Sequence, residues 1–533
     1  MKATICGALL ALSTLPLLPT PASASRTLKI SHQPIEGLVN EDGSIIHYDF
    51  LNQRFTEQEA SEIDFRRRKR DLSGAGSKRS QRECRDTKQQ SDKSGRHHSL
   101  IGGVLGGVGG LVGGVLGGVG HVVDGVKDGL THYVENGWMH DHKFGIVIAK
   151  AENEAADNEF LVDVSFGTPG QTLQMVLDTG SPEAWVYSPV CCYGNNHSSF
   201  DPAQSLTYLN RTVVDGKAVP APPGTPGQDF NVAYSSGSAT RGYVGLDTFA
   251  FEKGKFRVDG LPLALATNLT GSRRGRQMDG LIGLATGSGT QVPGGWTTAF
   301  EAMSQRGMLD ETYLTATLVK SDRKTGRNGG GQYVFGEVDK TLLKGDVTWS
   351  KVLSAFFWAG YVSKINIDGL VLAEGQGNAT NPIRFLVDTG SATISMPPVM
   401  AKAANAQIYG SYKTDSKKVQ LPWLVPCDTG LKKYEAKLPK GQRNKALEIT
   451  FGTEAFSLPI EDYVFFPQYP VPASEAGGRE NMCYSAIQEG LSSFTLLGLS
   501  WIKNHVVVFD QGGPSLSERR VGFGKRRDVK YDV

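Results

Sequence analysis

Two aspartates at matching positions of a repeated motif are the residues in this sequence best suited to catalysis. Asp178 begins Asp-Thr-Gly-Ser at residues 178–181, and Asp388 begins the same tetrapeptide at residues 388–391. Both copies directly follow a short apolar run that is typical of a buried strand. The spacing of 388 − 178 = 210 residues leaves room for a separate lobe around each copy. The repeat therefore predicts two carboxyl groups that are brought together from two halves of the chain.

A close pair of carboxyl groups is suited to hydrolysis at a carbonyl. Two carboxylates within about 3 Å of each other do not both ionise easily, so the pair tends to share one proton. The ionised partner can then take a proton from a bound water, while the protonated partner hydrogen-bonds the carbonyl oxygen that the water attacks. The glycines are expected to let the backbone turn tightly, and the hydroxyls to hydrogen-bond backbone and carboxylate oxygens. These supporting residues are Thr179, Gly180, Ser181, Thr389, Gly390 and Ser391.

A third Asp-Thr-Gly, at residues 428–430, shows how little this tripeptide means by itself. It lies between Pro426 and Lys432, and no apolar strand is expected before it. Asp and Gly are ordinary turn residues. This copy is therefore interpreted as a plain turn.

The elements that must position the aspartates are expected to be short strands. From about residue 145, apolar, β-branched and aromatic runs alternate with Gly, Pro, Asn and Asp turns, which predicts an all-β unit. Regular strand–helix alternation is lacking, which argues against a doubly wound fold. Strands are expected over residues 160–166, 173–177, 243–251, 333–335 and 506–509, and a short helix over residues 297–306.

Length and composition limit the classes of protein that remain. The chain has 533 residues, a comfortable length for two or three structural units, and 39% of them are hydrophobic, which excludes a wholly disordered protein. The 56 basic residues nearly balance the 54 acidic ones, so the formal charge of +2 gives no support for nucleic-acid binding. Six cysteines are too few for a disulfide-built scaffold.

The N-terminal quarter is expected to be removed or to regulate the rest. Residues 1–24 have the pattern of a signal peptide, with a basic start, an apolar stretch and Ala-Ser-Ala at residues 22–24, which predicts export into an oxidising compartment. Residues 25–144 are interpreted as a largely disordered pro-region with the basic run 65–70. A Gly-Gly-Val-Leu-Gly-Gly-Val repeat begins at residues 102 and 113. The repeat is either a flexible spacer or a self-associating or membrane-surface segment.

Several further motifs, in order, resemble those of the pepsin-like aspartic proteases in the form secreted by fungi. The resemblance extends from about Asn158 to Lys525, some two-thirds of the chain. It implies a bilobal all-β fold with one catalytic aspartate in each lobe, Asp178 and Asp388, and a substrate cleft between the lobes. The motifs are Phe166-Gly167-Thr168-Pro169, Tyr234-Ser235-Ser236-Gly237-Ser238, Asp279-Gly280-Leu281-Ile282-Gly283-Leu284, and Leu496-Leu497-Gly498 followed by residues 506–510.

The resemblance also implies roles for residues outside the repeat. Tyr234, Gly237 and Ser238 are similar to a flap hairpin over the substrate, and Trp185 to the tryptophan that hydrogen-bonds the flap tyrosine. There are two departures from the family pattern. Ser-Pro-Glu-Ala stands at residues 181–184 where Ser-Ser-Asp-Leu is commoner, and Leu499 stands where the family usually has Asp.

The cysteines and the glycosylation sequons bear on the prediction that the protein is exported. Cys427 and Cys483 resemble the disulfide pair of the family's second lobe, whereas Cys191 and Cys192 are adjacent and could bond only with strain, so their state is open. Four Asn-x-Ser/Thr sequons are candidates for glycosylation. They begin at Asn196, Asn210, Asn268 and Asn378.

The expected protein is a secreted aspartic endopeptidase that cleaves polypeptides at acid pH. Its lobes are placed at residues 145–345 and 346–533, and it is expected to be a monomer without a cofactor, a transmembrane segment or a nucleic-acid partner. No His-Glu-x-x-His, Cys-x-x-Cys pair or Gly-x-Ser-x-Gly supports a metal site or a serine hydrolase. Retention in the cell wall or delivery to a vacuole stays open. The alternatives are an inactive pepsin-fold binding or inhibitor protein and an adhesion protein built on the glycine repeat.

Overall fold

The described part of the chain begins at Gly145. The computed structural model describes residues 145–531 apart from short gaps at 155–156, 192–196, 235–237, 253, 271–277, 323–327, 376–383, 419–420, 466–469, 491–493 and 514–515. Several expectations therefore lie outside the described residues. These are the signal peptide, the pro-region with its glycine repeat, Cys192, Asn196, Gly237 and Asn378.

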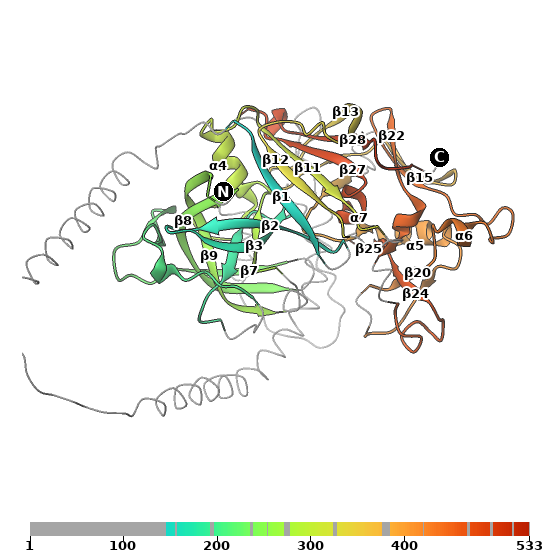
Figure 1. The fold of residues 1–533 in the computed structure, drawn as a ribbon, viewed down its shortest axis with the longest axis horizontal. Coiled ribbons are helices and arrows are strands. Elements are labelled where there is room, and N and C mark those ends of the chain that lie inside the picture. The colour runs from blue at the N-terminus through green and yellow to red at the C-terminus, as the bar shows by residue number, and fades with distance from the viewer. Residues whose placement is uncertain are drawn as a thin grey trace, which may run out of the picture. The chain divides into compact units, whose positions relative to one another are not determined.

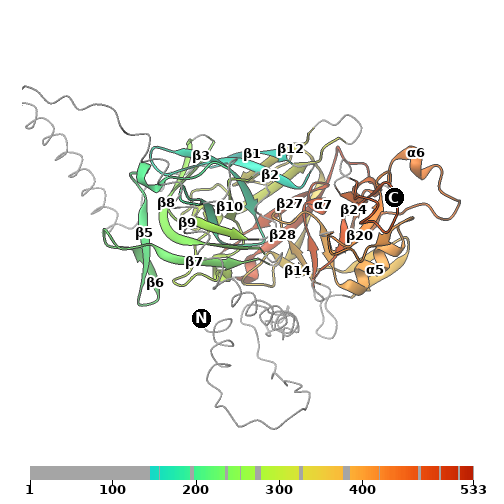
Figure 2. The same cartoon turned by 90° about the horizontal axis from the view of Figure 1, so that it is seen from below.

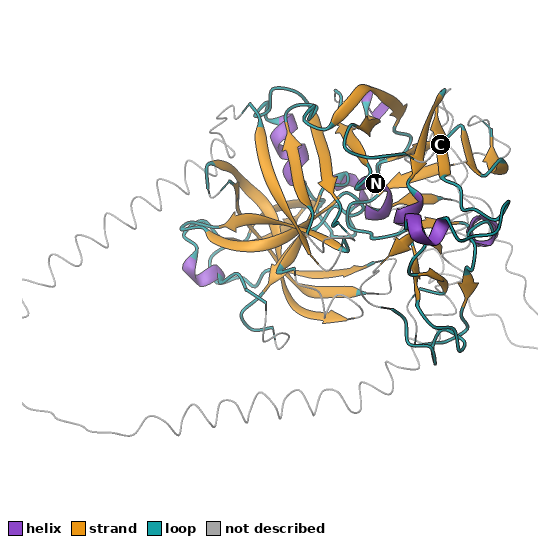
Figure 3. Ribbon diagram, turned by 45° about the vertical axis from the view of Figure 1, so that its right-hand side comes forward, coloured by secondary structure: helices purple, strands orange, loops and turns teal. Residues whose placement is uncertain are grey.

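Strands dominate the described residues, which form two β-rich lobes (Figure 3). The largest sheet has 15 strands, in the order β13-β28-β27-β11-β12-β1-β2-β3-β10-β4-β9-β8-β5-β6 with β7 paired to β8. Its strands are β1 (Val147–Glu154), β2 (Glu159–Phe166), β3 (Gln171–Asp178), β4 (Ala184–Tyr187), β5 (Leu209–Val214), β6 (Lys217–Pro220), β7 (Gln228–Ala233), β8 (Ala239–Phe251), β9 (Phe256–Thr270), β10 (Gly280–Gly283), β11 (Tyr313–Val319), β12 (Gly330–Phe335), β13 (Leu343–Lys351), β27 (His505–Asp510) and β28 (Arg520–Arg526).

Three smaller sheets and a few short helices complete the described fold. The five-stranded sheet has the order β14-β17-β26-β18-β25, and the two four-stranded sheets have the orders β16-β15-β21-β22 and β19-β20-β24-β23. Among the described residues, none of the helices is long and apolar enough to cross a membrane. The elements are β14 (Ala359–Tyr361), β15 (Lys364–Ile367), β16 (Leu370–Glu374), β17 (Arg384–Val387), β18 (Ile394–Met396), β19 (Tyr412–Lys413), β20 (Trp423–Pro426), β21 (Leu447–Phe451), β22 (Glu454–Leu458), β23 (Val464–Phe465), β24 (Met482–Ser485), β25 (Ile487–Glu489), β26 (Thr495–Leu497), α4 (Ala299–Gln305), α5 (Pro398–Ala406), α6 (Lys432–Glu435) and α7 (Leu499–Ile502).

The strands and the helix expected from the sequence are present, because local signals specify them. Strands β2, β3, β8, β12 and β27 cover the five predicted ranges, and every residue of β27 is buried. Helix α4 starts at a capping box, in which the Thr298 hydroxyl accepts from the backbone of Glu301 and the Glu301 carboxylate accepts from the backbone of Thr298. The all-β prediction is confirmed.

The same three-strand arrangement occurs once in each lobe. Strand β10 runs parallel to β3 and antiparallel to β4, and strand β26 runs parallel to β17 and antiparallel to β18. A further parallel strand follows in both copies, β9 beside β4 and β25 beside β18. The two copies place the ends of β3 and β17 in equivalent surroundings.

The two halves of the chain share the large sheet. Strand β11 pairs with β12 on one side and with β27 on the other, so strands from early and late in the sequence are hydrogen-bonded neighbours (Figure 1). Figure 2 shows β5 to β9 at one end, and α5, β20 and β24 at the other. One continuous hydrophobic core contains residues of both halves, for example Trp185, Trp358 and Trp501, all fully buried.

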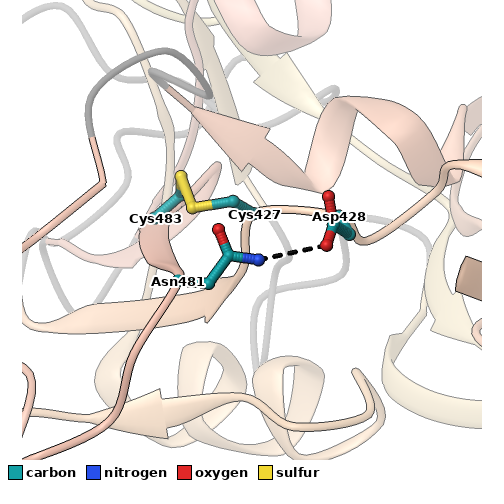
Figure 4. The surroundings of a disulfide bond; sticks show 4 residues. All are labelled: Cys427, Asp428, Asn481 and Cys483. Atoms are coloured by element: carbon teal, nitrogen blue, oxygen red, sulfur yellow. Dashed lines mark hydrogen bonds between the residues drawn. A yellow bond between two sulfur atoms is a disulfide. The ribbon is translucent and has the colours of Figure 1, made fainter.

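Cys427 and Cys483 are joined by a disulfide, the pairing that the resemblance implied (Figure 4). It connects residues at the adjacent strands β20 and β24, 56 positions apart in sequence. Beside it, the Asn481 side-chain amide donates to the Asp428 carboxylate over 3.0 Å. Asp428–Gly430 forms a turn, as predicted. The expectation that no strand precedes this turn is wrong, because β20 does; it is antiparallel to both its neighbours, unlike β3 and β17.

We expect the disulfide to stabilise the folded chain by restricting the unfolded one. Replacing both Cys427 and Cys483 by alanine should lower the free energy of unfolding by about 4 kcal/mol, the chain-entropy value for a loop of this length. Urea unfolding of the oxidised wild type and of the double variant measures the difference, and the reduced wild type serves as the control. Equal stability of all three proteins would contradict a stabilising role for this bond.

Candidate active site

The two repeated aspartates lie at the carboxyl ends of corresponding strands. Asp178 is the last residue of β3, and Asp388 follows the last residue of β17. Each of these strands has a parallel neighbour, β10 or β26, and the backbone of Leu284, just beyond β10, donates to the Asp178 carbonyl over 2.7 Å. Both side chains are buried, with 3% and 9% of the residue exposed.

Each aspartate is held by its own loop through the same two hydrogen bonds. Asp178 Oδ1 accepts from the backbone nitrogen of Gly180 over 2.8 Å, and its Oδ2 accepts from the Ser181 hydroxyl over 2.6 Å. The second copy repeats both bonds, at 2.8 and 2.5 Å, among Asp388, Gly390 and Ser391. The serine hydroxyls therefore hold the carboxylates, as predicted.

Each carboxyl group occupies the space beside the glycine of the opposite loop. A Cβ atom on Gly180 would collide with the Asp388 carboxyl, and one on Gly390 would collide with the Asp178 carboxyl. Neither glycine has a positive φ. The expected turns are present at residues 179–180 and 389–390, but their backbone conformation does not itself require glycine. Glycine is needed because the facing carboxyl group leaves no room for a side chain. The two aspartates are thereby brought together.

The threonines between aspartate and glycine join the two loops to each other. The backbone nitrogen of Thr179 donates to the Thr389 hydroxyl over 3.0 Å, and that of Thr389 donates to the Thr179 hydroxyl over 3.0 Å. Each hydroxyl in turn donates across the interface, to the carbonyls of Val387 over 3.1 Å and Leu177 over 2.6 Å. These buried bonds fix the distance between the loops that carry the aspartates.

The surroundings favour a proton shared by the two aspartates. Burial raises the pKa of Asp388, and the charge of Asp178 and a hydrogen bond between the two side chains raise it further, whereas the bonds from Ser391 and Gly390 act in the opposite direction. Such coupled carboxyls titrate as a pair. The arrangement can therefore hold one protonated and one ionised group at the same time.

Tyr333 is a site residue that the sequence analysis missed. It lies on β12, is fully buried, and forms a side-chain hydrogen bond with Thr389. Burial raises its pKa, and the charges of both aspartates add to this effect. No motif marks Tyr333, since it is one aromatic residue in an apolar strand far from both aspartates in sequence.

The expected flap residues meet as the resemblance implied. Trp185 Nε1 donates to the Tyr234 hydroxyl over 2.9 Å, and Tyr234 immediately follows β7, which is hydrogen-bonded to β8. The backbone nitrogen of Tyr234 donates to the carbonyl of Ser238 over 2.8 Å, and Ser238 is buried. These bonds connect the turn end of the β7–β8 hairpin to the buried Trp185, seven residues after Asp178.

The remaining residues singled out from the sequence include two candidate glycosylation asparagines, Asn210 and Asn268, and one cysteine, Cys191. The side-chain amide of Asn210, where a glycan would be attached, donates to the carbonyl of Thr225 over 2.8 Å, and Asn268 lies on β9. Cys191 is partly buried. In the described part of the chain, no group of three or more His, Cys, Asp or Glu side chains is placed so that it could hold a metal ion.

Comparison with known proteins gives the relationships of the chain. The sequence model of the family "Eukaryotic aspartyl protease" matches residues 159–525. Rhizopuspepsin-4 of Rhizopus niveus is 27% identical over 365 residues, 68% of this chain and 78% of that protein. Syncephapepsin of Syncephalastrum racemosum is 25% identical over 360 residues, 68% of this chain and 77% of that protein. Gastricsin of Macaca fuscata fuscata is 30% identical over 281 residues, 50% of this chain and 67% of that protein.

The family match covers most of the residues that the structure describes, including both loops that carry the repeated aspartates. The matched residues include both copies of the Asp-Thr-Gly-Ser motif, the Trp185–Tyr234 pair and the Cys427–Cys483 disulfide. The chain therefore belongs to the eukaryotic aspartyl protease family and is an aspartic-type peptidase, which acts on polypeptides.

Proposed function

We propose that this protein is a secreted endopeptidase that cleaves proteins at acid pH, with Asp178 and Asp388 activating a water molecule. The observation that carries the proposal is the opposed pair of buried carboxyls, each next to the other's glycine. An inactive pepsin-fold protein would be expected to lack one member of this pair or its partners. Both aspartates and all their hydrogen-bond donors are present.

The proposed reaction uses the dyad as acid and base. The ionised aspartate takes a proton from a water held between the two carboxyls, and the protonated one hydrogen-bonds the carbonyl oxygen under attack. The proton then passes to the leaving amine as the C–N bond breaks, and the dyad returns to its starting state. The threonine bonds between the loops keep the carboxyls in this geometry without taking part in the proton transfers.

Acid activity follows from the requirement for one proton on the dyad. Raising the pH removes that proton, so kcat/KM is expected to fall towards neutrality. The measurement is hydrolysis of a denatured protein between about pH 3 and 7, a range that brackets the carboxyl reference values. Highest activity near neutrality would contradict the proposal.

The proposed pro-region is expected to keep the secreted chain latent. Chains that begin at Ser25, at Asp71 and at Asp141 should differ in activity at the same acid pH. The last should be active at once, because it retains Gly145, whose backbone donates to Met308, and the whole of β1. Electrophoresis during each assay shows whether the longer chains are shortened before they act. Equal activity of all three without shortening would contradict latency.

A further inference from the structure

Glu183 is a buried carboxyl that neither the acid–base mechanism nor the flap contacts use. It lies five residues after Asp178, directly before β4, and only 2% of the residue is exposed. Its carbonyl accepts from the backbone of Gly283 over 3.0 Å, beside the bond from Leu284 to Asp178. Consecutive backbone nitrogens, those of Gly283 and Leu284, therefore bind the carbonyls of Glu183 and Asp178 and hold the two residues close together. Glu183 is also a position where the chain departs from the common family pattern.

The Glu183 side chain connects this part of the chain to the turn end of the β7–β8 hairpin. Its Oε1 accepts from the Thr290 hydroxyl over 2.8 Å and from the backbone nitrogen of Gln291 over 3.1 Å. The Gln291 side-chain amide donates to the carbonyl of Ala233 over 3.3 Å. Ala233 is the last residue of β7 and precedes Tyr234. Two hydrogen bonds, both made by Gln291, thus link Glu183 to the residue next to the flap tyrosine.

The charge of Asp178 acts on the buried carboxyl of Glu183. Burial raises the pKa of Glu183, and repulsion by Asp178 adds to the effect, whereas hydrogen bonds from Thr290, Gln291 and its own backbone nitrogen act in the opposite direction. The partners that face it from residues 290–291 and from β10 are neutral. The charged group that acts on it is therefore Asp178. A negative charge on Glu183 disfavours loss of the last proton from the dyad.

We infer that Glu183 is a positioning residue that ties the Asp178 loop to the turn end of the flap hairpin and extends the working range of the enzyme to higher pH. The inference rests on the proposed function of the dyad. As the pH rises, the charge that forms on Glu183 keeps the dyad singly protonated over a wider range. The hydrogen bonds to residues 290–291 remain in either state of the carboxyl, because they are accepted by its oxygen.

The test compares the wild type with Glu183→Gln, which keeps the accepting oxygen and removes the ionisation. We expect the two proteins to have equal kcat/KM at the acid optimum. In the plot of kcat/KM against pH, the decline on the high-pH side (the upper limb) should lie about half a pH unit lower for Glu183→Gln, so that kcat/KM there is reduced about threefold. Glu301→Gln is the matched control. Glu301 is also a buried carboxyl, its pKa is raised by burial, and it accepts from the loop nitrogen of Gly287, but its charged partner is Arg519. This control should leave the upper limb unchanged.

Thermal unfolding supplies a readout that does not depend on activity. A carboxyl whose pKa is raised in the folded state makes the protein less stable as the pH rises above its unfolded value. The Tm of Glu183→Gln minus that of the wild type should therefore increase between about pH 4 and pH 7. A constant Tm difference would overturn the inference, because Glu183 would not then titrate in a buried site.

The outcomes separate this inference from the proposed function. A profile of Glu183→Gln that superimposes on that of the wild type, a uniform loss at every pH, or a limb shifted upward overturns the role of Glu183 while the enzyme remains an acid protease. Absence of wild-type activity at every pH overturns the proposed function and the role of Glu183 together. A downward shift confined to Glu183→Gln supports both.

Discussion

Replacing either Asp178 or Asp388 by asparagine is expected to abolish nearly all peptide hydrolysis and to leave the fold intact. Asparagine has almost the same shape: its Oδ1 can still accept from the glycine nitrogen of its loop, and its Nδ2 can donate to the serine hydroxyl, which then becomes the acceptor. It cannot, however, supply the acid or the base of a shared-proton pair. Loss of general acid–base catalysis costs on the order of 10²–10⁴ in rate, and kcat of each purified variant should fall by at least that amount.

The third Asp-Thr-Gly provides a matched control for this experiment. Asp428 begins it but is exposed, lies in a turn, and accepts a hydrogen bond from Asn481. Asp428→Asn should therefore keep wild-type turnover. Unfolding curves of all three variants should lie close to that of the wild type. Near-wild-type turnover by Asp178→Asn or Asp388→Asn would contradict the assignment of the dyad.

The second large effect concerns stability in acid and originates at His505. This residue begins β27, is fully buried, and its Nδ1 lies 3.0 Å from the carbonyl of Trp501, on whose ring the imidazole is stacked. Burial lowers the pKa of His505 to about 3; the Trp501 carbonyl opposes this, and the charge of Arg526 adds to it. A buried neutral imidazole is therefore part of the core between α7 and β28.

The sign of the pH effect follows from where the proton binds. Between its unfolded pKa, about 6.5, and its folded pKa, about 3, His505 takes up a proton in the unfolded chain only. The free energy of unfolding therefore decreases as the pH falls through this window. By pH 4 the cost amounts to about 3 kcal/mol, at a pH where the enzyme is proposed to work.

Two neutral replacements test this expectation. His505→Gln can keep a hydrogen bond with the Trp501 carbonyl, and His505→Phe keeps a ring against Trp501 and Tyr531. At pH 7.5 both variants should be less stable than the wild type, because they lose the native packing of the imidazole and His505 is not yet protonated in the unfolded wild-type chain. From pH 7.5 to pH 4 both should gain about 3 kcal/mol relative to the wild type in urea unfolding. A difference from the wild type that does not change with pH would contradict the role of His505.

A buried ionic cluster between the halves of the chain behaves differently in acid. Lys503 Nζ lies 2.8 Å from Asp157 and 3.4 Å from Asp462. Burial acts to raise the pKa of both aspartates, but both values are lowered: for Asp157 by Lys503 and hydrogen bonds from Asn153 and Ser321, and for Asp462 by Lys320 and Lys503. The stability that these carboxylates contribute is present above their unfolded pKa and is lost only as the pH falls through the lowered folded values. His505 therefore loses stability at a higher pH than this cluster does.

Local patterns in the sequence were sufficient to predict the class of fold and to single out the two aspartates that we propose as the catalytic pair. An apolar run that ends in Asp-Thr-Gly-Ser predicts a buried strand with a polar loop at its end, and β3 with Asp178 has that form. Its repetition around Asp388 predicted two equivalent halves, which the parallel pairs β3–β10 and β17–β26 show. Each signal lies within one strand or one turn, so neighbouring residues alone determine it.

Which residues from distant parts of the chain contact one another could be learned from the tertiary structure alone, and not from the sequence patterns. Thr179 and Thr389 exchange hydrogen bonds across 210 positions, and it is the Asp388 carboxyl that leaves no room for a side chain at Gly180 in the turn of its own loop. Tyr333 and Glu183 likewise join the site through partners that no spacing indicates. Sequence patterns report which face of an element is buried. Which atoms meet on that face depends on how separate elements pack, because burial is non-directional whereas a hydrogen bond requires one particular partner.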